Sequence, residues 1–330
     1  MAYRAIPPCS TGSTGRWRIV EPVALAALVL DAAIGWPAAL YARIGHPVGA
    51  FARLIDACEA QWNRKGRSDR ARRAAGVATL TLLVAVAAAT ACALEAVSRV
   101  LLGSSGWIAI AVIAWPGLAQ RSLDDHVRPV ASALTKGDLD GARTAVGMIV
   151  GRDTVSLVEA GVARAAIESL AESFCDGVAA PLFWLVVLGL PGLWAYKSIN
   201  TADSLIGHLE PRWRMFGWAA ARADDVANYL PARLAGLILC LAGGGGFATM
   251  LRDAHRHASP NAGWPEAAMA GVLGVRLAGP VAYDGVVCDK GWIGDGRTSA
   301  TGRDVRRALA IYRRACLMLW ILAGGLAWVR

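Results

Sequence analysis

Long apolar stretches alternate with polar ones along this chain of 330 residues. A membrane-spanning helix needs about 20 largely apolar residues to cross the hydrocarbon layer of a bilayer. Only residues 76–102 make a comfortable span, because the other stretches are short or contain Gly and Pro. The segments of near-membrane length are residues 20–36, 76–102, 106–119, 177–195, 229–248 and 308–329, with 264–282 as a weaker amphipathic candidate. This pattern predicts an all-α, polytopic integral membrane protein with several transmembrane or re-entrant helices and helical cytoplasmic loops.

The composition supports a membrane location. Hydrophobic residues make up 55% of the chain and charged residues only 18%, whereas about a quarter of a soluble domain is charged. The net charge is +9, but the basic residues cluster in loops beside apolar runs, and no stacking aromatic residues lie among them. We therefore interpret the charge as a membrane-topology signal and expect no nucleic acid partner.

Several familiar site motifs are missing from the chain. The seven cysteines are scattered and include no CxxC pair, which argues against a disulfide framework and a zinc ribbon. The patterns GxxxxGK[ST], HExxH and GxSxG do not occur either. Any nucleotide must therefore be bound without a Walker loop.

The N-terminus resembles a signal peptide, because arginines precede the first apolar run. Asp31 lies inside that run, however, and no small-x-small cleavage site follows, so a retained first membrane segment is favoured. We expect residues 1–18 to be a flexible tail and residues 1–330 to form a single membrane-embedded domain.

Two polar connections separate the apolar segments. Residues 37–73 carry a dense run of arginines and should stay cytoplasmic; Glu59 within them is expected to be an ordinary surface charge. Residues 120–176 are the longest polar stretch and show helical spacing. If 76–102 and 106–119 form a hairpin, both connections lie on the cytoplasmic side.

A stripe of charge leads into the segment 177–195. Arg164, Glu168, Glu172 and Asp176 follow one another at intervals of four residues, and residues four apart share one face of a helix. Mg²⁺ prefers oxygen ligands and commonly uses one or two carboxylates together with substrate phosphates, so the three carboxylates are candidate metal ligands. The competing interpretation is a solvated helix face with i,i+4 ion pairs.

The segment 177–195 is short, contains two prolines and has polar residues at both ends. A simple span would place Asp176 and the polar residues after 195 on opposite sides of the bilayer. A broken or re-entrant helix would bring them together, and irregular backbone at membrane depth survives only where it lines a cavity. We favour the broken helix.

The stretch GRDT offers a possible phosphate site. Arg152 beside a helix N-terminus could hold an anion with its guanidinium and nearby backbone N–H groups. The alternative is a plain helix cap, in which Asp153 or Thr154 starts a helix that runs through Glu168 and Glu172.

The stretch YKSINTADSLIGH follows the segment 177–195 directly. Lys197, Asn200, Thr201 and Asp203 give it much hydrogen-bonding capacity at a membrane boundary, although Lys197 could simply extend its ammonium group to the interface.

Four further residues are candidates. Asp31 lies within an apolar segment, where an ionisable residue is a functional hypothesis by default. His46, before Pro47, could be a base, a ligand or a structural histidine. Asn261 and Glu266 belong to SPNAGWPEAA, a polar turn of the kind that lines sites.

Taken together, these motifs resemble the adenosylcobinamide-phosphate synthase family, also called the CobD/CbiB family, of cobalamin biosynthesis. The resemblance runs in order from about Leu28 to Arg314. It rests on LDAAIG with HPVG, GRDT, ARAAIESLAES, YKSINTADSLIG, GWAAARADDVANYLPARL, SPNAGWPEAAMAGVLGV and IGDGR. Two positions depart from the family pattern: Trp36 stands where Asp is frequent, and Ser173 replaces a usual Asn.

The resemblance implies a multi-pass enzyme of the inner membrane whose active site faces the cytoplasm. It would use ATP and Mg²⁺ to join (R)-1-aminopropan-2-ol or its phosphate to a propionate of adenosylcobyric acid, with other late cobalamin-pathway membrane enzymes as candidate partners. We assign Glu168, Glu172 and Asp176 to Mg²⁺ or to the base. Arg152 and Lys197 would bind phosphate, and Asn200, Thr201 and Asp203 would orient substrate. A transporter and a membrane sensor are the alternatives.

Overall fold

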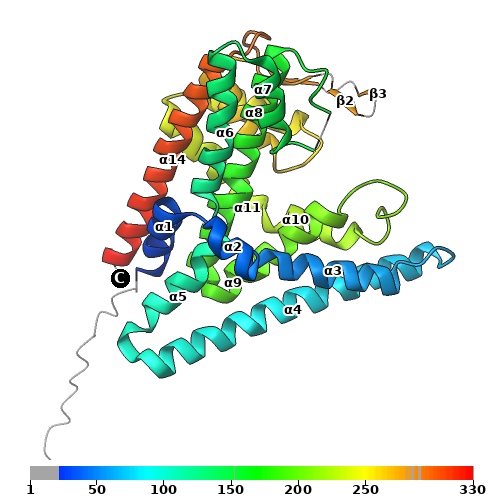
Figure 1. Ribbon diagram of the computed structural model, residues 1–330, viewed down its shortest axis with the longest axis vertical. Coiled ribbons are helices and arrows are strands. Elements are labelled where there is room, and N and C mark those ends of the chain that lie inside the picture. The colour runs from blue at the N-terminus through cyan, green and yellow to red at the C-terminus, as the bar shows by residue number, and fades with distance from the viewer. Residues whose placement is uncertain (1–21, 152, 280, 284–285, 289–290, 330) are drawn as a thin grey trace, which may run out of the picture.

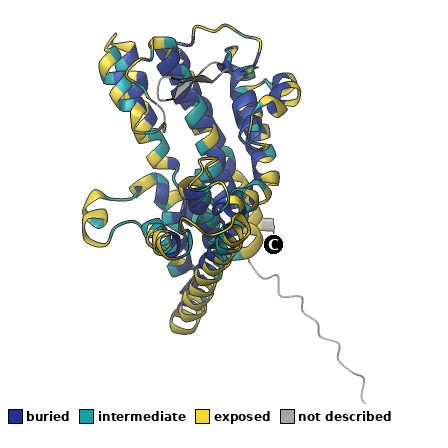
Figure 2. Ribbon diagram, turned by 90° about the vertical axis from the view of Figure 1, so that its right-hand side faces the viewer, coloured by how far each residue is buried: buried dark blue, intermediate teal, exposed yellow. Residues whose placement is uncertain are grey.

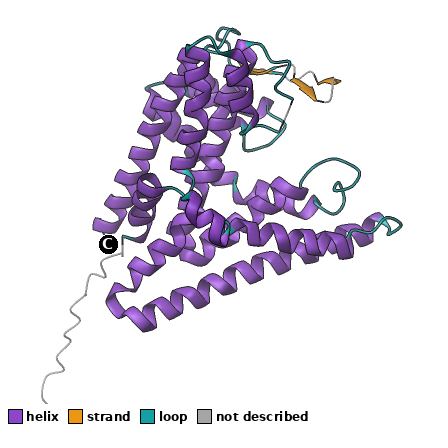
Figure 3. Ribbon diagram, in the orientation of Figure 1, coloured by secondary structure: helices purple, strands orange, loops and turns teal. Residues whose placement is uncertain are grey.

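Helices make up nearly all of the fold (Figure 3). The computed structural model describes residues 22–329 apart from 152, 280, 284–285 and 289–290. Within these residues the α-helices are α1 (Val23–Ile34), α2 (Ala38–Ile44), α3 (Val48–Trp62), α4 (Asp69–Leu102), α5 (Gly106–Ala114), α6 (Gln120–Thr135), α7 (Leu139–Gly147), α8 (Glu159–Phe174), α9 (Ala180–Ile206), α10 (Trp218–Ala227), α11 (Tyr229–Gly243), α12 (Phe247–Asp253), α13 (Gly263–Leu273) and α14 (Gly302–Val329). The all-α prediction is confirmed.

The described residues include four short strands, which form two antiparallel pairs. β1 (Leu277–Ala278) pairs with β4 (Trp292–Ile293), with Leu277 opposite Ile293, and β2 (Val281–Tyr283) pairs with β3 (Val286–Cys288). The strands lie together at one end of the molecule (Figure 1). They were not expected from the sequence, because each is only two or three residues long.

Several helices are long and apolar enough to cross a membrane. The described residues contain three such stretches, Asp69–Thr135, Glu159–Ile206 and Gly302–Trp328. Two bent helix pairs, α1 with α2–α3 and α10 with α11, raise the number to five if each pair is one span. The polytopic character predicted from the sequence is therefore consistent with the structure.

The weaker candidate 264–282 is not an amphipathic membrane helix. It becomes α13, whose side chains are buried on all sides of the helix, including Pro265, Ala268 and Leu273, and then the strand β1. Gly274 ends the helix with φ of 66°, a left-handed conformation that glycine adopts without strain. The amphipathic interpretation is wrong because the polar residues of this segment face other parts of the protein.

The helices form two groups that meet near the middle of the molecule (Figure 1). In one group α14 packs against α6, α8 and α11. In the other, α9 packs against α3, α4 and α10, and α3 and α4 extend sideways together as an arm. Figure 2 shows the buried residues concentrated where the helices face one another.

The arm is held by contacts between α3 and the connection from α9 to α10, which could not be read from the sequence of the arm alone. The Glu59 side chain is only 10% exposed. Arg212 Nε donates to its Oε1 at 2.7 Å, and Trp213 Nε1 donates to the same oxygen at 2.9 Å. The expectation that Glu59 is an ordinary surface charge is wrong, because the connection from α9 to α10 folds back over α3.

A break in α9 shapes the centre of the molecule. A short π-helix, Cys175–Ala179, continues α8 into α9, and Gly189 interrupts α9 with φ 68° and ψ −158°. That backbone conformation is open essentially to glycine alone. Pro191 then lies near the start of the second half, where its missing N–H has no helical partner to lose. The broken helix predicted for 177–195 is confirmed.

Candidate functional site

The site forms where the π-helix, the second half of α9 and α10 meet. Asn200 Nδ2 lies 3.3 Å from Asp176 Oδ2 and 3.3 Å from Asp224 Oδ1. One side-chain amide therefore joins carboxylates from two other elements, because Asp176 is on the π-helix and Asp224 is on α10. Single π-helical turns inside longer helices occur frequently at functional sites, since they shift the side chains that follow.

A second amide holds Asp224 from the other side. Asn228 Nδ2 donates to Asp224 Oδ2 at 2.9 Å, and Tyr196 donates its hydroxyl to Asn228 Oδ1 at 2.9 Å. Asn228 and Tyr196 are almost completely buried. The tyrosine therefore fixes the orientation of the amide, and the amide fixes the orientation of the carboxylate.

These residues border a cavity of about 220 Å³ that is rich in acidic side chains. Its lining comprises Glu172, Cys175, Asp176, Asp203, Ala221, Asp224, Asp225, Asn228, Ser259, Asn261 and Ala262. Asn261 closes one side, where its Nδ2 donates to the backbone oxygen of Asp225 at 2.8 Å. Five carboxylates from four consecutive elements, α8, the π-helix, α9 and α10, thus surround one small space.

Lys197 supplies positive charge beside this cavity. Its ammonium group interacts electrostatically with Asp176 and Asp224, and also with His46. Thr201, one turn later on α9, donates its hydroxyl to the backbone oxygen of Lys197 at 2.7 Å. Lys197 therefore offsets part of the charge of the carboxylates and does not simply reach toward an interface.

The predicted stripe on α8 is divided between two environments. Glu172 and Asp176 line the cavity. Glu168 instead accepts a hydrogen bond from the backbone N–H of Ala278 in β1 at 2.8 Å, and the Arg164 guanidinium lies 4.9 Å from the ring centre of Trp292 in β4. One half of the stripe thus faces the acidic cavity, and the other half holds the β1–β4 pair.

The chemistry of the lining fits a hard cation, because carboxylate and amide oxygens are the ligands that Mg²⁺ prefers. No group of three or more His, Cys, Asp or Glu side chains with metal-holding geometry occurs among the described residues. Glu168, Glu172 and Asp176 are not such a group here. Magnesium sites that rely on substrate phosphates and waters need only one or two carboxylates, so a metal role for Glu172 and Asp176 stays a prediction.

Asp31, in the first membrane segment, and His46, before α3, have structural contacts elsewhere. Asp31 is 2% exposed and accepts hydrogen bonds from the backbone N–H groups of Gln120 at 2.6 Å and Arg121 at 3.4 Å. It thereby caps the N-terminus of α6. His46 Nδ1 accepts from the Val48 N–H at 3.3 Å. Neither residue lines the cavity.

In the stretch GRDT, Asp153 takes part in a turn rather than in a helix cap. Asp153 Oδ1 accepts from the Val155 N–H at 2.9 Å, and α8 begins only after Val158, which makes no side-chain cap. The prediction that Asp153 or Thr154 caps this helix is wrong, because Asp153 is engaged by the local turn. Arg152 lies outside the described residues.

Glu266 is also used structurally. Its carboxylate lies 3.6 Å from His257 Nε2, and it is 4% exposed. The stretch SPNAGWPEAA therefore contributes Ser259, Asn261 and Ala262 to the cavity lining, whereas Glu266 lies in α13 and does not line it.

The sequence reasoning missed three acidic or amide side chains of the lining: Asp224, Asp225 and Asn228. They belong to the stretch RADDVANYL. An adjacent acid pair, with an amide one helical turn later and an apolar helix immediately after, is the same type of signal that drew notice to Asp176. It could have been recognised by that rule.

The fold and site thus define a polytopic helical membrane protein with a carboxylate-lined cavity at a broken helix. The model of the CobD/CbiB protein family matches residues 24–312, and the chain belongs to this family. Its relatives include the cobalamin biosynthesis protein CobD of Rhodobacter capsulatus, which is 50% identical over 91% of this chain and 95% of that protein. The protein therefore takes part in cobalamin biosynthesis.

More distant relatives carry the same name. CobD of Sinorhizobium sp is 47% identical over 89% of this chain and 94% of its own length. CobD of Rhizobium meliloti is 45% identical over 89% of this chain and 92% of its own length. No solved structure matches the chain.

Proposed function

We propose that this protein is an ATP-dependent ligase that forms an amide between a propionate of adenosylcobyric acid and (R)-1-aminopropan-2-ol or its phosphate. The observation that carries the proposal is the gathering of Glu172, Asp176, Asp203, Asp224 and Asp225 around one small cavity beside Lys197. Membership of a cobalamin biosynthesis family makes a corrinoid acid the natural substrate class. Active-site location on the cytoplasmic face of the inner membrane is part of the proposal.

Amide formation sets three chemical demands. The carboxylate must be activated, most simply by phosphoryl transfer from ATP, so that a leaving group departs when nitrogen attacks. The amine arrives protonated, and a base must remove a proton before its lone pair can attack. The developing negative charge on phosphate oxygens must be stabilised by cations or N–H donors.

The cavity offers groups for each demand. Asp176 and Asp224 have oxygens held in fixed positions by Asn200, which suits a base that must meet the amine in one geometry. Asp203 and Asp225 lie on the same cavity and can accept the remaining N–H groups of an ammonium ion. Lys197 would bind phosphate, and Mg²⁺ held by cavity carboxylates would neutralise phosphate charge.

The size of the cavity indicates which part of the reaction it holds. Pockets for whole drug-sized ligands span about 300–1,000 Å³, and this cavity has about 220 Å³. It accommodates the amino alcohol or the end of a propionate arm, but not a corrin ring. We infer that the macrocycle stays outside and extends one arm inward.

The test is product formation by the purified protein in detergent with adenosylcobyric acid, amino alcohol, ATP and Mg²⁺, followed by mass spectrometry. Ligation without a membrane supports the ligase and argues against the transporter. Supplying aminopropanol and its phosphate in separate reactions decides which amine is used. Absence of product from folded protein with both amines would refute the proposal.

A further inference from the structure

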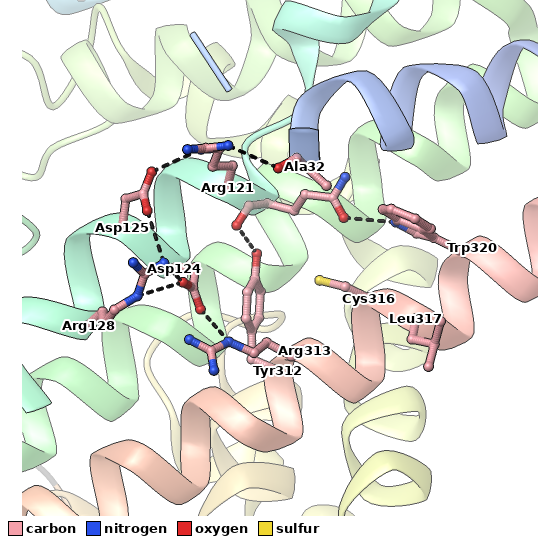
Figure 4. A pocket seen from close by; sticks show the side chains of 11 residues that line it. Ala32, Arg121, Asp124, Asp125, Arg128, Tyr312, Arg313, Cys316, Leu317 and Trp320 are labelled. Atoms are coloured by element: carbon pink, nitrogen blue, oxygen red, sulfur yellow. Dashed lines mark hydrogen bonds and ion pairs between the residues drawn. The ribbon is translucent and has the colours of Figure 1, made fainter. Parts of the chain in front are cut away.

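A second cavity, of about 460 Å³, lies between α1, α6 and α14 (Figure 4). It shares no lining residue with the carboxylate cavity. Three guanidinium groups, of Arg121, Arg128 and Arg313, lie on one side of it, and Leu317 and Trp320 lie on the other. The cavity therefore combines a cationic wall with an apolar one.

The cationic wall keeps an excess of positive charge. Arg313 Nε donates to Asp124 Oδ1 at 2.7 Å, and Arg121 Nε donates to Asp125 Oδ2 at 3.3 Å. Arg128 contacts both aspartates. Among the side chains that line the cavity, three arginines face two aspartates, an excess of one positive charge. The buried carboxylate of Asp31, which does not line the cavity, also interacts with Arg121. Arg313 is 55% exposed, and within the described residues its terminal nitrogens make no hydrogen bond, so they can receive an anion.

The cavity also lies at the boundary between a charged and an apolar part of α14. The helix carries five arginines between residues 303 and 314, and no charged residue from 315 to 329. From the cavity onward its surface is apolar, with Leu317 in the cavity wall 56% exposed and Ile321 65% exposed. Trp320 bridges the boundary, because its ring adjoins the apolar surface while its Nε1 donates to Gln120 Oε1 at 3.0 Å. Tryptophan occupies such positions at membrane–water interfaces.

From these observations we propose that the cavity binds the phosphodiester headgroup of an anionic membrane phospholipid. The phosphate would meet the guanidinium groups, which bind it through charge-assisted hydrogen bonds, and the acyl chains would lie along the apolar half of α14. Net charge argues for an anionic lipid, since the two aspartates are already engaged by arginine. The proposal does not depend on the ligase function.

The test uses the full-length protein in detergent, titrated with short-chain phosphatidylglycerol, short-chain phosphatidylcholine or inorganic phosphate, with binding read by calorimetry. Arg313→Gln should weaken phosphatidylglycerol binding about tenfold, because one charge-assisted contact is lost. The matched control is Arg306→Gln, an exposed arginine on the same helix outside the cavity, which should bind like wild type. Arg128→Gln serves as a second variant if Arg313→Gln does not fold.

Four outcomes would overturn the proposal. Equal weakening by Arg306→Gln would mean that the helix attracts anions only through its general charge. Equal binding of phosphatidylcholine would exclude selection by net charge. Tighter binding of inorganic phosphate than of the lipid would assign the cavity to a soluble phosphate compound. Unchanged phosphatidylglycerol binding in both pocket variants would likewise exclude a headgroup site.

Discussion

The amide of Asn200 reaches a carboxylate oxygen of Asp176 at 3.3 Å, although 24 residues separate the two in the chain. A straight helix of that length would hold them roughly 36 Å apart. The reversal at Gly189 removes this distance. This hydrogen bond therefore shows that the break in α9 brings Asn200 back to Asp176 and so assembles the site.

The first prediction concerns this amide. Asn200→Leu removes both donors and leaves two partly buried carboxylates without them, which costs about 1–3 kcal/mol per unsatisfied group. We expect amide formation to fall at least tenfold and the thermal unfolding temperature to drop. Ser204→Ala is the control, because that exposed hydroxyl bonds only to the backbone of the preceding turn. Wild-type ligation by Asn200→Leu would show that the Asp176–Asp224 geometry is irrelevant to activity.

The break itself can be tested at Gly189. Alanine there must adopt φ near 68° and ψ near −158°, which costs on the order of 1–3 kcal/mol for a residue with a side chain. We expect Gly189→Ala to lower both stability and ligation, as measured by thermal unfolding in detergent and by product formation. Gly325→Ala, in the exposed part of α14 with open space around it, should be neutral or slightly stabilising. Equal stability of the two variants would contradict a strained break.

The part of the fold that could be predicted is the part encoded locally. Apolar length predicted the membrane helices, and helical spacing in 120–176 predicted α6, α7 and α8. Two prolines and polar ends predicted the interruption in 177–195, because these features conflict with a simple span. In each case the residues that carry the signal are neighbours in the chain.

The remainder depends on partners distant in sequence. Glu168 and Glu172 look alike in the sequence, yet Glu168 is held by Ala278, which lies 110 residues away. Glu59 has the neighbours of a surface residue and is buried by Arg212, 153 residues away. A single sequence contains no record of such pairings. Long-range packing, rather than helix propensity, decided which carboxylates entered the cavity.

A further prediction concerns the side of the membrane on which the two ends of the broken helix lie. Because Asp176 and Asn200 meet, single cysteines at Ser173 and Ser204 should react with the same membrane-impermeant reagent from the same side of intact cells. Cysteines at Ser68 and Lys136 should be accessible only from the cytoplasm, as the basic connection requires. The native cysteines are replaced first, since Cys92 is exposed. Labelling of the cysteines at 173 and 204 from opposite sides would exclude a broken helix that returns to the same side of the membrane.

An acid-sensitive contact lies away from the membrane helices, at the end of α12. Asp253 is fully buried, and Arg252 Nη2 lies 2.7 Å from its Oδ2. The hydrogen bond from Arg252 lowers the pKa of Asp253 below its usual value, and the Gly294 N–H adds to the effect. A lowered pKa means that the carboxylate stabilises the fold above about pH 4 and that this contribution is lost as the pH falls through the folded-state pKa.

Asp253→Asn should therefore destabilise the protein at pH 7 by about 1–3 kcal/mol, and its difference from wild type should shrink as the pH is lowered below about 4. Thermal unfolding in detergent across this pH range measures both effects. Asp295→Asn is the matched control, since Asp295 binds the same arginine but is 72% exposed and should matter little. A constant difference at all pH values would show that burial of the side chain, not its charge, matters.

The last prediction separates the two halves of the α8 stripe. Replacing Glu172 by Gln keeps the size of the side chain but removes a negative charge from the cavity. If that charge holds Mg²⁺ or serves proton transfer, ligation should fall steeply, since a positioned acid–base group alone contributes roughly 10²–10⁴-fold. Glu168→Gln should have a far smaller effect, because a glutamine oxygen can still accept from the Ala278 N–H that Glu168 now binds.

Product formation at several Mg²⁺ concentrations distinguishes the possible roles of Glu172. A weakened metal site should be partly rescued by more Mg²⁺, whereas a lost base should not be. Glu159→Gln, in the exposed first turn of the same helix, is the control and should ligate like wild type. Corrinoid binding should survive in all three variants, because we propose that the macrocycle stays outside the cavity. If folded Glu172→Gln retains wild-type activity, the carboxylates of α8 form only a solvated helix face, and the base must be sought among Asp176, Asp224 and their neighbours.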